Sequence, residues 1–297
     1  MQAALGFAMA HLYPGDAVSS RFFHVAGMEE RESERGESMF SFGCCLPGGP
    51  FDAGQAHRLA AMGFSYGEIA AAPLAAMTNE EFAALRREQQ VGGLPIQAAN
   101  CFLPGELSLF APDQKEKLRG HVERVLHRAA DLGIDTVVFG SGGARRIPKD
   151  TPREVGEDVT ADFLTFCSRL CAQTGVTLVI EPLNKTECNV LNTVEEAARL
   201  ARRLNLPQIR VLADAYHVFC EQEDFSVLSR EREWLAHIHV AEPPGRMVPG
   251  ADGGAYLACF GKALREAGYD GRVSIECRWE HFEAEMEQGL HFLKKSF

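Results

Sequence analysis

Short apolar runs alternate along the chain with longer stretches in which apolar residues recur every three or four positions. The short runs are rich in Val, Ile and Phe, which is typical of strands, and the longer stretches have the spacing of helices that bury one face. The helical patterns include residues 115–133 and 194–205. The short runs predict eight strands: FSFGCCL (40–46), FSYGEIA (64–70), IQAANCF (96–102), TVVFGS (136–141), TLVIEPL (177–183), IRVLADA (209–215), HIHVAE (237–242) and RVSIEC (272–277).

This alternation of strand and helix predicts an α/β fold. Strands joined through helices form parallel sheets with right-handed crossovers. Eight such units in 297 residues favour a closed (β/α)8 TIM barrel over an open sheet, because barrels of this kind need about 250 residues. We therefore predict that residues 39–297 form one catalytic barrel domain.

Residues 1–38 do not share the alternating pattern. Residues 1–15 are mildly apolar but lack the basic residues of a secretory signal, and residues 29–37 (EERESERGE) have no apolar side chain to bury. We predict that residues 1–38 are a disordered N-terminal extension, or that translation starts at Met39.

Composition narrows the choice of partners. The chain carries 41 acidic and 30 basic residues, for a formal net charge of -11, and such a field repels nucleic acid phosphate. No apolar run approaches the roughly 20 residues of a membrane helix. The nine cysteines include no Cys-x-x-Cys pair, and those at Cys44, Cys45, Cys101 and Cys277 are expected to be buried reduced thiols. We expect a cytoplasmic homo-oligomer that binds neither nucleic acid nor membrane.

Acidic and imidazole side chains occupy the C-terminal ends of later predicted strands. Glu181 follows TLVI, Asp214 follows IRVLA, and Glu276 follows RVSI. His237 and His239 alternate in HIHV and share a face, with His239 nearer the end of the strand. Catalytic groups of barrels come from these strand ends, so four residues from four strands are expected to converge. Nothing comparable marks the first three strands.

Three carboxylates and an imidazole form an oxygen-rich set of ligands. Buried together without a cation, the three carboxylates would repel one another and lose their hydration. The set therefore predicts one divalent metal ion, with manganese as the first choice and cobalt, magnesium or zinc as alternatives. The competing interpretation is that each residue is separately a helix cap or a surface group.

Three further polar residues lie in the loops after these strands. Glu187 follows in EPLNKTECN, His217 in DAYH, and Arg246 in VAEPPGRMVPG. A carboxylate, an imidazole and a guanidinium near a metal suit the hydroxyl groups and the developing negative charge of a sugar substrate. Taken singly, they could be a solvated loop charge, a turn residue and a surface cation.

The pattern resembles the xylose-isomerase-like barrel superfamily and, within it, the ketose 3-epimerases typified by D-tagatose and D-psicose 3-epimerases. The resembling segments are IEPLNKTECN, DAYH, HIHVAEPPGRMVPG and SIEC. This resemblance implies that Glu181, Asp214, His239 and Glu276 are metal ligands, and that Glu181 and Glu276 are also the catalytic acid/base pair.

The same resemblance implies that Glu187, His217 and Arg246 bind substrate. It implies a metal-dependent epimerase that inverts carbon 3 of a ketose: one glutamate removes the proton, the metal stabilises the enediolate, and the other glutamate returns a proton on the opposite face. Glu68, in the second predicted strand, is a candidate for a substrate contact from the first half of the chain.

Three alternatives stay open. An aldose–ketose or sugar-phosphate isomerase would use the same metal barrel, and the loop of residues 140–148 offers glycine amides with Arg145 and Arg146 as a phosphate site, although two solvated arginines on a glycine turn are the simpler interpretation. A non-catalytic barrel could bind a sugar or a partner. An endonuclease with three zinc ions would need further histidines near the strand ends, whereas His57, His121 and His127 fall in helical patterns.

The predicted boundary at Met39 can be tested by truncation. Because residues 1–38 supply no predicted strand, a chain that begins at Met39 should fold and keep full activity. Circular dichroism melts and a turnover assay on the full and shortened chains measure this. Loss of solubility or activity in the shortened chain would show that residues 1–38 pack on the barrel or cover its mouth.

Overall fold

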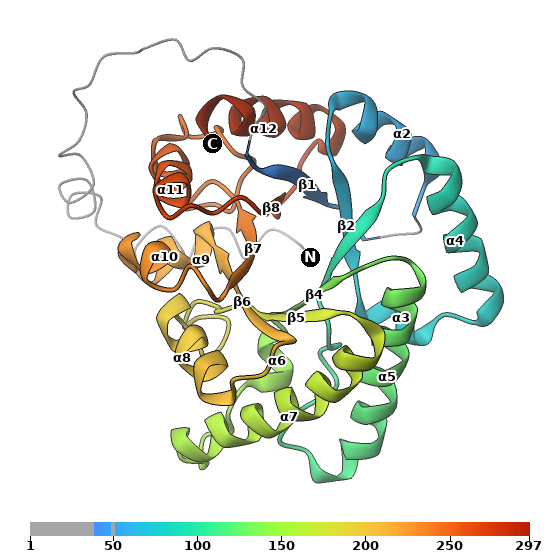
Figure 1. Ribbon diagram of the computed structural model, residues 1–297, viewed down its shortest axis with the longest axis vertical. Coiled ribbons are helices and arrows are strands. Elements are labelled where there is room, and N and C mark those ends of the chain that lie inside the picture. The colour runs from blue at the N-terminus through green and yellow to red at the C-terminus, as the bar shows by residue number, and fades with distance from the viewer. Residues whose placement is uncertain (1–38, 49–50) are drawn as a thin grey trace, which may run out of the picture. The chain divides into compact units, whose positions relative to one another are not determined.

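A computed structural model describes residues 39–48 and 51–297. The predictions made for residues 1–38 lie outside the described residues. Eight parallel strands follow one another around a closed barrel, and β1 pairs with β8 to complete it (Figure 1). The strands are β1 Ser41–Cys45, β2 Tyr66–Ala70, β3 Ile96–Asn100, β4 Thr136–Phe139, β5 Thr177–Ile180, β6 Ile209–Asp214, β7 Leu235–Val240 and β8 Arg272–Ile275.

Helices cover the outside of the barrel and lie between successive strands in the chain (Figure 1). They are α2 Ala53–Met62, α3 Ala72–Ala76, α4 Asn79–Gly92, the 3₁₀ turn η1 Pro112–Gln114, α5 Lys115–Asp131, α6 Gly142–Arg145, α7 Arg153–Thr174, α8 Val194–Leu204, α9 Ala215–Cys220, α10 Ser226–Arg230, α11 Ala255–Glu266 and α12 Phe282–Ser296.

The predicted (β/α)8 barrel is confirmed. Each predicted strand overlaps an observed one, and the seventh is displaced, since it covers Leu235–Val240 and not residues 237–242. The helical pattern of residues 115–133 corresponds to α5, and that of residues 194–205 corresponds to α8. Thr193 caps α8 by accepting a hydrogen bond from the Glu196 amide, as its position before the apolar repeat favours.

Alternation along the strands separates two apolar clusters. Residues such as Val137, Leu178 and Val211 belong to a large cluster that packs strands against helices. Val138, Val179 and Leu212, each one position further on, form a separate buried cluster, which places them inside the barrel. The inner face of β4, β5 and β6 is therefore apolar at this level.

The opposite side of the barrel interior is polar. Tyr66 and Glu68 of β2, His237 of β7 and Ser274 of β8 are completely buried and linked by hydrogen bonds. Gly43 of β1 leaves the room that this packing needs, because a Cβ there would lie 2.2 Å from the Tyr66 ring. The polar residues and the apolar cluster together fill the centre of the barrel below its C-terminal end.

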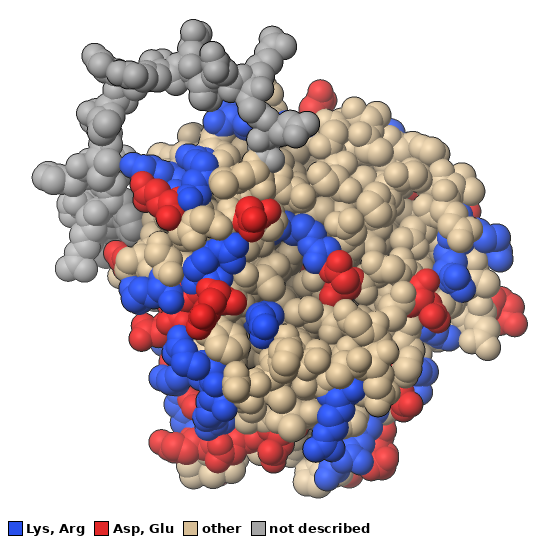
Figure 2. Space-filling view, viewed as in Figure 1, with Lys and Arg blue, Asp and Glu red and all other residues tan. Residues whose placement is uncertain are grey.

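All nine cysteines are free thiols. Cys44 and Cys45 are buried, as predicted, but Cys101 is exposed and Cys277 is half-buried. The prediction for these two was wrong because both lie just past the ends of β3 and β8, where the chain leaves the sheet. No helix among the described residues is long and apolar enough to cross a membrane. On the face shown in Figure 2, basic and acidic side chains are interspersed.

Candidate metal and active site

The four predicted ligands meet at the C-terminal end of the barrel. Asp214 is the last residue of β6 and His239 lies in β7, whereas Glu181 and Glu276 directly follow β5 and β8. One ligand atom from each residue lies within 4.8 Å of the others. Barrel closure thus brings together four residues that are far apart in the sequence, as predicted.

Two atoms of this group lack hydrogen bonds, although they are buried. Nδ1 of His239 lies 3.4 Å from Oε1 of Glu181 and 3.4 Å from Oε2 of Glu276. Among the described residues, neither Nδ1 of His239 nor Oε1 of Glu181 has a hydrogen-bond partner. Buried polar atoms are normally satisfied, so unpaired atoms that converge between carboxylates fit a divalent cation well.

Two residues that follow β4, Gly140 and Arg145 of α6, hold Glu181 in place. Gly140 allows its close approach, because a Cβ at this position would lie 2.2 Å from Oε2 of Glu181. Arg145 is completely buried, and its guanidinium donates to the backbone carbonyls of Phe139 and Glu181 at 2.9 and 2.6 Å. The expectation of a solvated Arg145 was therefore wrong. Its side chain fastens the ends of β4 and β5 together.

Arg246 reaches the same group from the loop after β7. Its Nη2 forms an ion pair with Glu276 and lies 3.4 Å from Oδ2 of Asp214, while Nη1 lies 3.8 Å from Glu187. The guanidinium also stacks over the Tyr216 ring, 5.2 Å from its centroid. Arg246 has a left-handed backbone with φ of 55°, which is strained for a residue with a Cβ and occurs where surrounding contacts enforce it.

His217 is buried beside Asp214. The backbone amide of Asn184 donates to its Nδ1 at 3.2 Å, so the ring proton of neutral His217 is on Nε2. This Nε2 lies 3.7 Å from Oδ2 of Asp214 and has no hydrogen-bond partner among the described residues. Asn184 also donates to Glu187 at 3.0 Å. The structure thus brings Glu187, His217 and Arg246 to one side of the four-residue group.

Burial and neighbouring charges shift the pKa values of Glu181 and Glu276 in opposite directions. Burial, followed by the charge of Glu276, raises the pKa of Glu181. Burial acts in the same direction on Glu276, but the charges of His239 and Arg246 outweigh it and lower the pKa of Glu276 to about 2. Burial lowers the pKa of His239, yet the neighbouring carboxylates, Glu68 first among them, raise it well above its usual value. In this arrangement the positive charges next to Glu276 stabilise it as a carboxylate.

The first three strands also supply polar groups, contrary to the sequence prediction. Asn100, the last residue of β3, donates from Nδ2 to Oε1 of Glu276 at 2.8 Å. Glu68 of β2 accepts hydrogen bonds from His237 and His239 and does not face the mouth as a substrate contact would. The signal for both was a polar residue on the inward face of an apolar strand. Their partners lie 169 or more residues away in the chain, so the sequence pattern could not reveal them.

Comparison with known proteins gives the family. A model described as "Xylose isomerase-like TIM barrel" matches residues 56–296. The chain belongs to this family. It is 28% identical over 224 residues to the 3-dehydro-D-guloside 4-epimerase of Escherichia coli K12, a match that covers 73% of this chain and 83% of the relative. It is also 28% identical over 230 residues to the D-psicose 3-epimerase of Agrobacterium fabrum, covering 74% of this chain and 76% of the relative.

Solved structures share the fold. The 3-keto-D-glucoside 4-epimerase of E. coli superposes with a TM-score of 0.73 at 22% identity, covering 86% of this chain and 99% of that one. The D-psicose 3-epimerase of Clostridium cellulolyticum H10 superposes with a TM-score of 0.76 at 18% identity, over the same shares of the two chains. An AP endonuclease of family 2 from Brucella melitensis, at 0.69 and 21%, has the same fold under a different name. The fold alone therefore does not fix the reaction.

The unpaired atoms at the strand ends predict a metal-dependent gain in stability. A cation that binds only the folded chain, at a hundred times its Kd, contributes about 2.7 kcal/mol. For a domain of this size we expect Mn²⁺ to raise Tm by roughly 5 to 10 °C over chelator-treated protein. Differential scanning fluorimetry with and without Mn²⁺, with elemental analysis of the protein as isolated, measures this.

Asp214→Asn provides the control. The amide oxygen still accepts the hydrogen bond from the Tyr216 amide that begins α9, but the negative charge is lost. Its melting temperature should respond much less to Mn²⁺. An identical response in both proteins, or no response in the unaltered chain, would show that these four residues do not hold the ion.

Proposed function

We propose that this protein is a metal-dependent sugar epimerase that inverts a carbon next to a ketone, with carbon 3 of a ketose as the first choice. The observation that carries this proposal is the approach of two carboxylates, from Glu181 and Glu276, to one point beside Nδ1 of His239. The relatives named as epimerases at carbons 3 and 4 support the same chemistry.

Glu181, Asp214, His239 and Glu276 would hold the ion. A divalent cation bound there would polarise the substrate carbonyl and stabilise the negative charge that develops when the neighbouring carbon loses its proton. Manganese suits three carboxylates and one imidazole, and cobalt or magnesium would also suit them.

Proton transfer would fall to Glu181 and Glu276. Their strands, β5 and β8, are not neighbours in the barrel, because β6 and β7 lie between them. The two carboxylates therefore reach the site from different sides, and a sugar held between them would present opposite faces of one carbon. One glutamate would take the proton from the first face, and the other would return a proton on the second, which inverts the carbon.

His217, Glu187 and Arg246, which lie beside the four candidate ligands, suit the hydroxyl groups of a sugar. Nε2–H of His217 is a buried donor without a partner among the described residues, and Glu187 is an acceptor at the rim. Arg246 lies against Glu276 and Asp214, so its charge would orient the substrate and stabilise an oxyanion next to the reacting carbon.

A second candidate function uses the same chemistry on a different sugar. The similarity to a 3-dehydro-D-guloside 4-epimerase supports inversion at carbon 4 of a 3-keto sugar, where the reacting carbon again adjoins a ketone.

Two other functions are disfavoured. A phosphate site for a sugar phosphate is disfavoured because Arg145 is buried and Arg146 donates to the Glu187 carbonyl at 2.6 Å. The three-zinc endonuclease is also disfavoured, since His57 lies on α2 and His121 and His127 lie on α5.

Replacing the glutamates tests the two-base mechanism. Glu181→Gln or Glu276→Gln keeps a neutral oxygen at the site but removes the base, so we expect turnover to fall by about 10²- to 10⁴-fold while some Mn²⁺ binding survives. Uptake of deuterium from D₂O into D-psicose, D-tagatose and 3-keto glycosides, followed by NMR, identifies the reacting carbon and the substrate together. If Glu276→Gln retained near-normal turnover with bound metal, a one-base isomerase would be the better description.

Arg246→Lys separates substrate handling from chemistry. Lysine keeps the charge but loses the planar fork that contacts two carboxylates and stacks on Tyr216. We expect KM to rise by about tenfold or more, with a smaller change in the Kd for Mn²⁺. Steady-state kinetics and calorimetry on the same preparation measure the two quantities. An unchanged KM would remove Arg246 from the substrate site.

A further inference from the structure

Glu68 is a carboxylate in the centre of the barrel with no access to solvent. Isolated burial of such a charge is strongly unfavourable, so its partners must compensate it. Its two oxygens accept three hydrogen bonds from three side chains: Oε1 lies 3.0 Å from Nε2 of His239, and Oε2 lies 2.9 Å from Nε2 of His237 and 2.6 Å from Oγ of Ser274. The charge of Glu68 is thus held by groups from β7 and β8.

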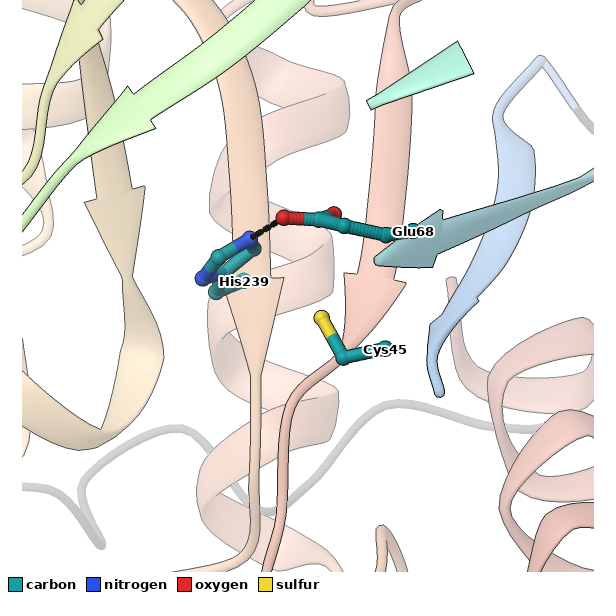
Figure 3. A group of neighbouring side chains, drawn as sticks. All are labelled: Cys45, Glu68 and His239. Carbon is teal, nitrogen blue, oxygen red and sulfur yellow. Dashed lines mark hydrogen bonds and ion pairs between the residues drawn. The ribbon is translucent and has the colours of Figure 1, made fainter. Parts of the chain in front are cut away.

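The hydrogen bond between His239 and Glu68 decides which ring nitrogen of His239 faces the candidate metal site. An ionised carboxylate can only accept, so Nε2 of His239 must carry a proton. Nδ1, on the other edge of the ring, then points at Glu181 and Glu276 and can present a lone pair to a cation. Figure 3 shows this arrangement, with Glu68 of β2 directed at the His239 ring.

The other contacts hold the Glu68 carboxylate itself. Ser274 donates its proton to Oε2, so the Tyr66 hydroxyl, 2.8 Å from Oγ of Ser274, is the donor in that pair. His237 donates to the same oxygen. With Oε2 fixed by two donors, Oε1 has little freedom to turn away from His239.

Cys45 lies close enough to Glu68 and His239 to suggest a second ion. One ligand atom from each of these three residues lies within 4.8 Å of the others, and Figure 3 shows the thiol beside the pair. The Glu68–His239 hydrogen bond already uses the atoms that such an ion would need. Burial, with a further contribution from the charge of Glu68, raises the pKa of the Cys45 thiol well above its usual value.

We propose that Glu68 is a positioning residue, which acts through His239 to turn Nδ1 toward the metal site and thereby sets the affinity for a divalent cation. The inference rests on the metal site of the proposed function and adds to it a residue from the opposite side of the barrel. Partners of this kind change metal affinity by about 10- to 100-fold in other metal sites.

Glu68→Gln tests the proposal. The amide oxygen can accept from one imidazole, but the amide nitrogen donates, so one histidine must reverse its ring proton and the negative charge behind His239 is lost. We expect calorimetric titration with Mn²⁺ to give a Kd about 10- to 100-fold weaker than that of the unaltered chain. Ser274→Ala is the matched control: it removes one donor to Glu68, but His237 still holds Oε2 and the His239 contact remains. Its Mn²⁺ affinity should therefore stay close to that of the unaltered chain even where its Tm falls.

A second measurement does not depend on whether Glu68→Gln folds. In the unaltered chain loaded with Zn²⁺, ¹⁵N NMR of labelled histidine should show His239 with a protonated Nε2 and a metal-bound Nδ1. Three results would overturn this inference alone. They are the opposite tautomer of His239, equal Mn²⁺ affinity in Glu68→Gln and the unaltered chain, and a second zinc ion that binds the unaltered chain but not Cys45→Ser. Failure of the unaltered chain to bind either ion would overturn the proposed function and this inference with it.

Discussion

The arrangement of the barrel mouth depends on the repulsion between three carboxylates held close together and away from water. Glu181, Asp214 and Glu276 have oxygens within 4.8 Å of one another and of His239. Such a group is tolerated only where positive charge is supplied. In the structure, His239 and Arg246 supply it from within the chain. A bound cation would supply it more fully, because it can contact all four residues at once.

This constraint explains why the surrounding residues are so closely fixed. Glu276 is held by Asn100 and Arg246, and Glu181 is held through its backbone by the buried Arg145. Gly140 leaves the space into which the Glu181 carboxylate fits. Each contact opposes the tendency of like charges to move apart, so the site is preorganised by residues from β3, α6 and the loops that follow β4 and β7.

Apolar and polar residues occupy different parts of the barrel interior. On β5 and β6 the inward residues below the mouth, Val179 and Leu212, are apolar, and Glu181 and Asp214 lie two positions further along the chain. On β2, β7 and β8 a buried polar network of Glu68, His237 and Ser274 lies behind His239. Members of the family share the barrel, and their names show that they act at different carbons and on different sugars. In barrels of this kind, variation of the loops at the C-terminal face allows one fold to support different reactions.

The sequence by itself determined the barrel, because the alternation of strands and helices is a local pattern with one favourable parallel arrangement. It also determined the four residues at the mouth, since the polar residue that ends an apolar strand is visible without knowledge of its neighbours. Only the tertiary structure decided the roles of Glu68, Asn100 and Arg145. Each is one polar residue in an ordinary local setting, and the partners of Glu68 and Asn100 lie in or directly after strands 169 or more residues further along the chain. A hydrogen bond between such positions depends on barrel closure, and closure is a property of all eight strands together.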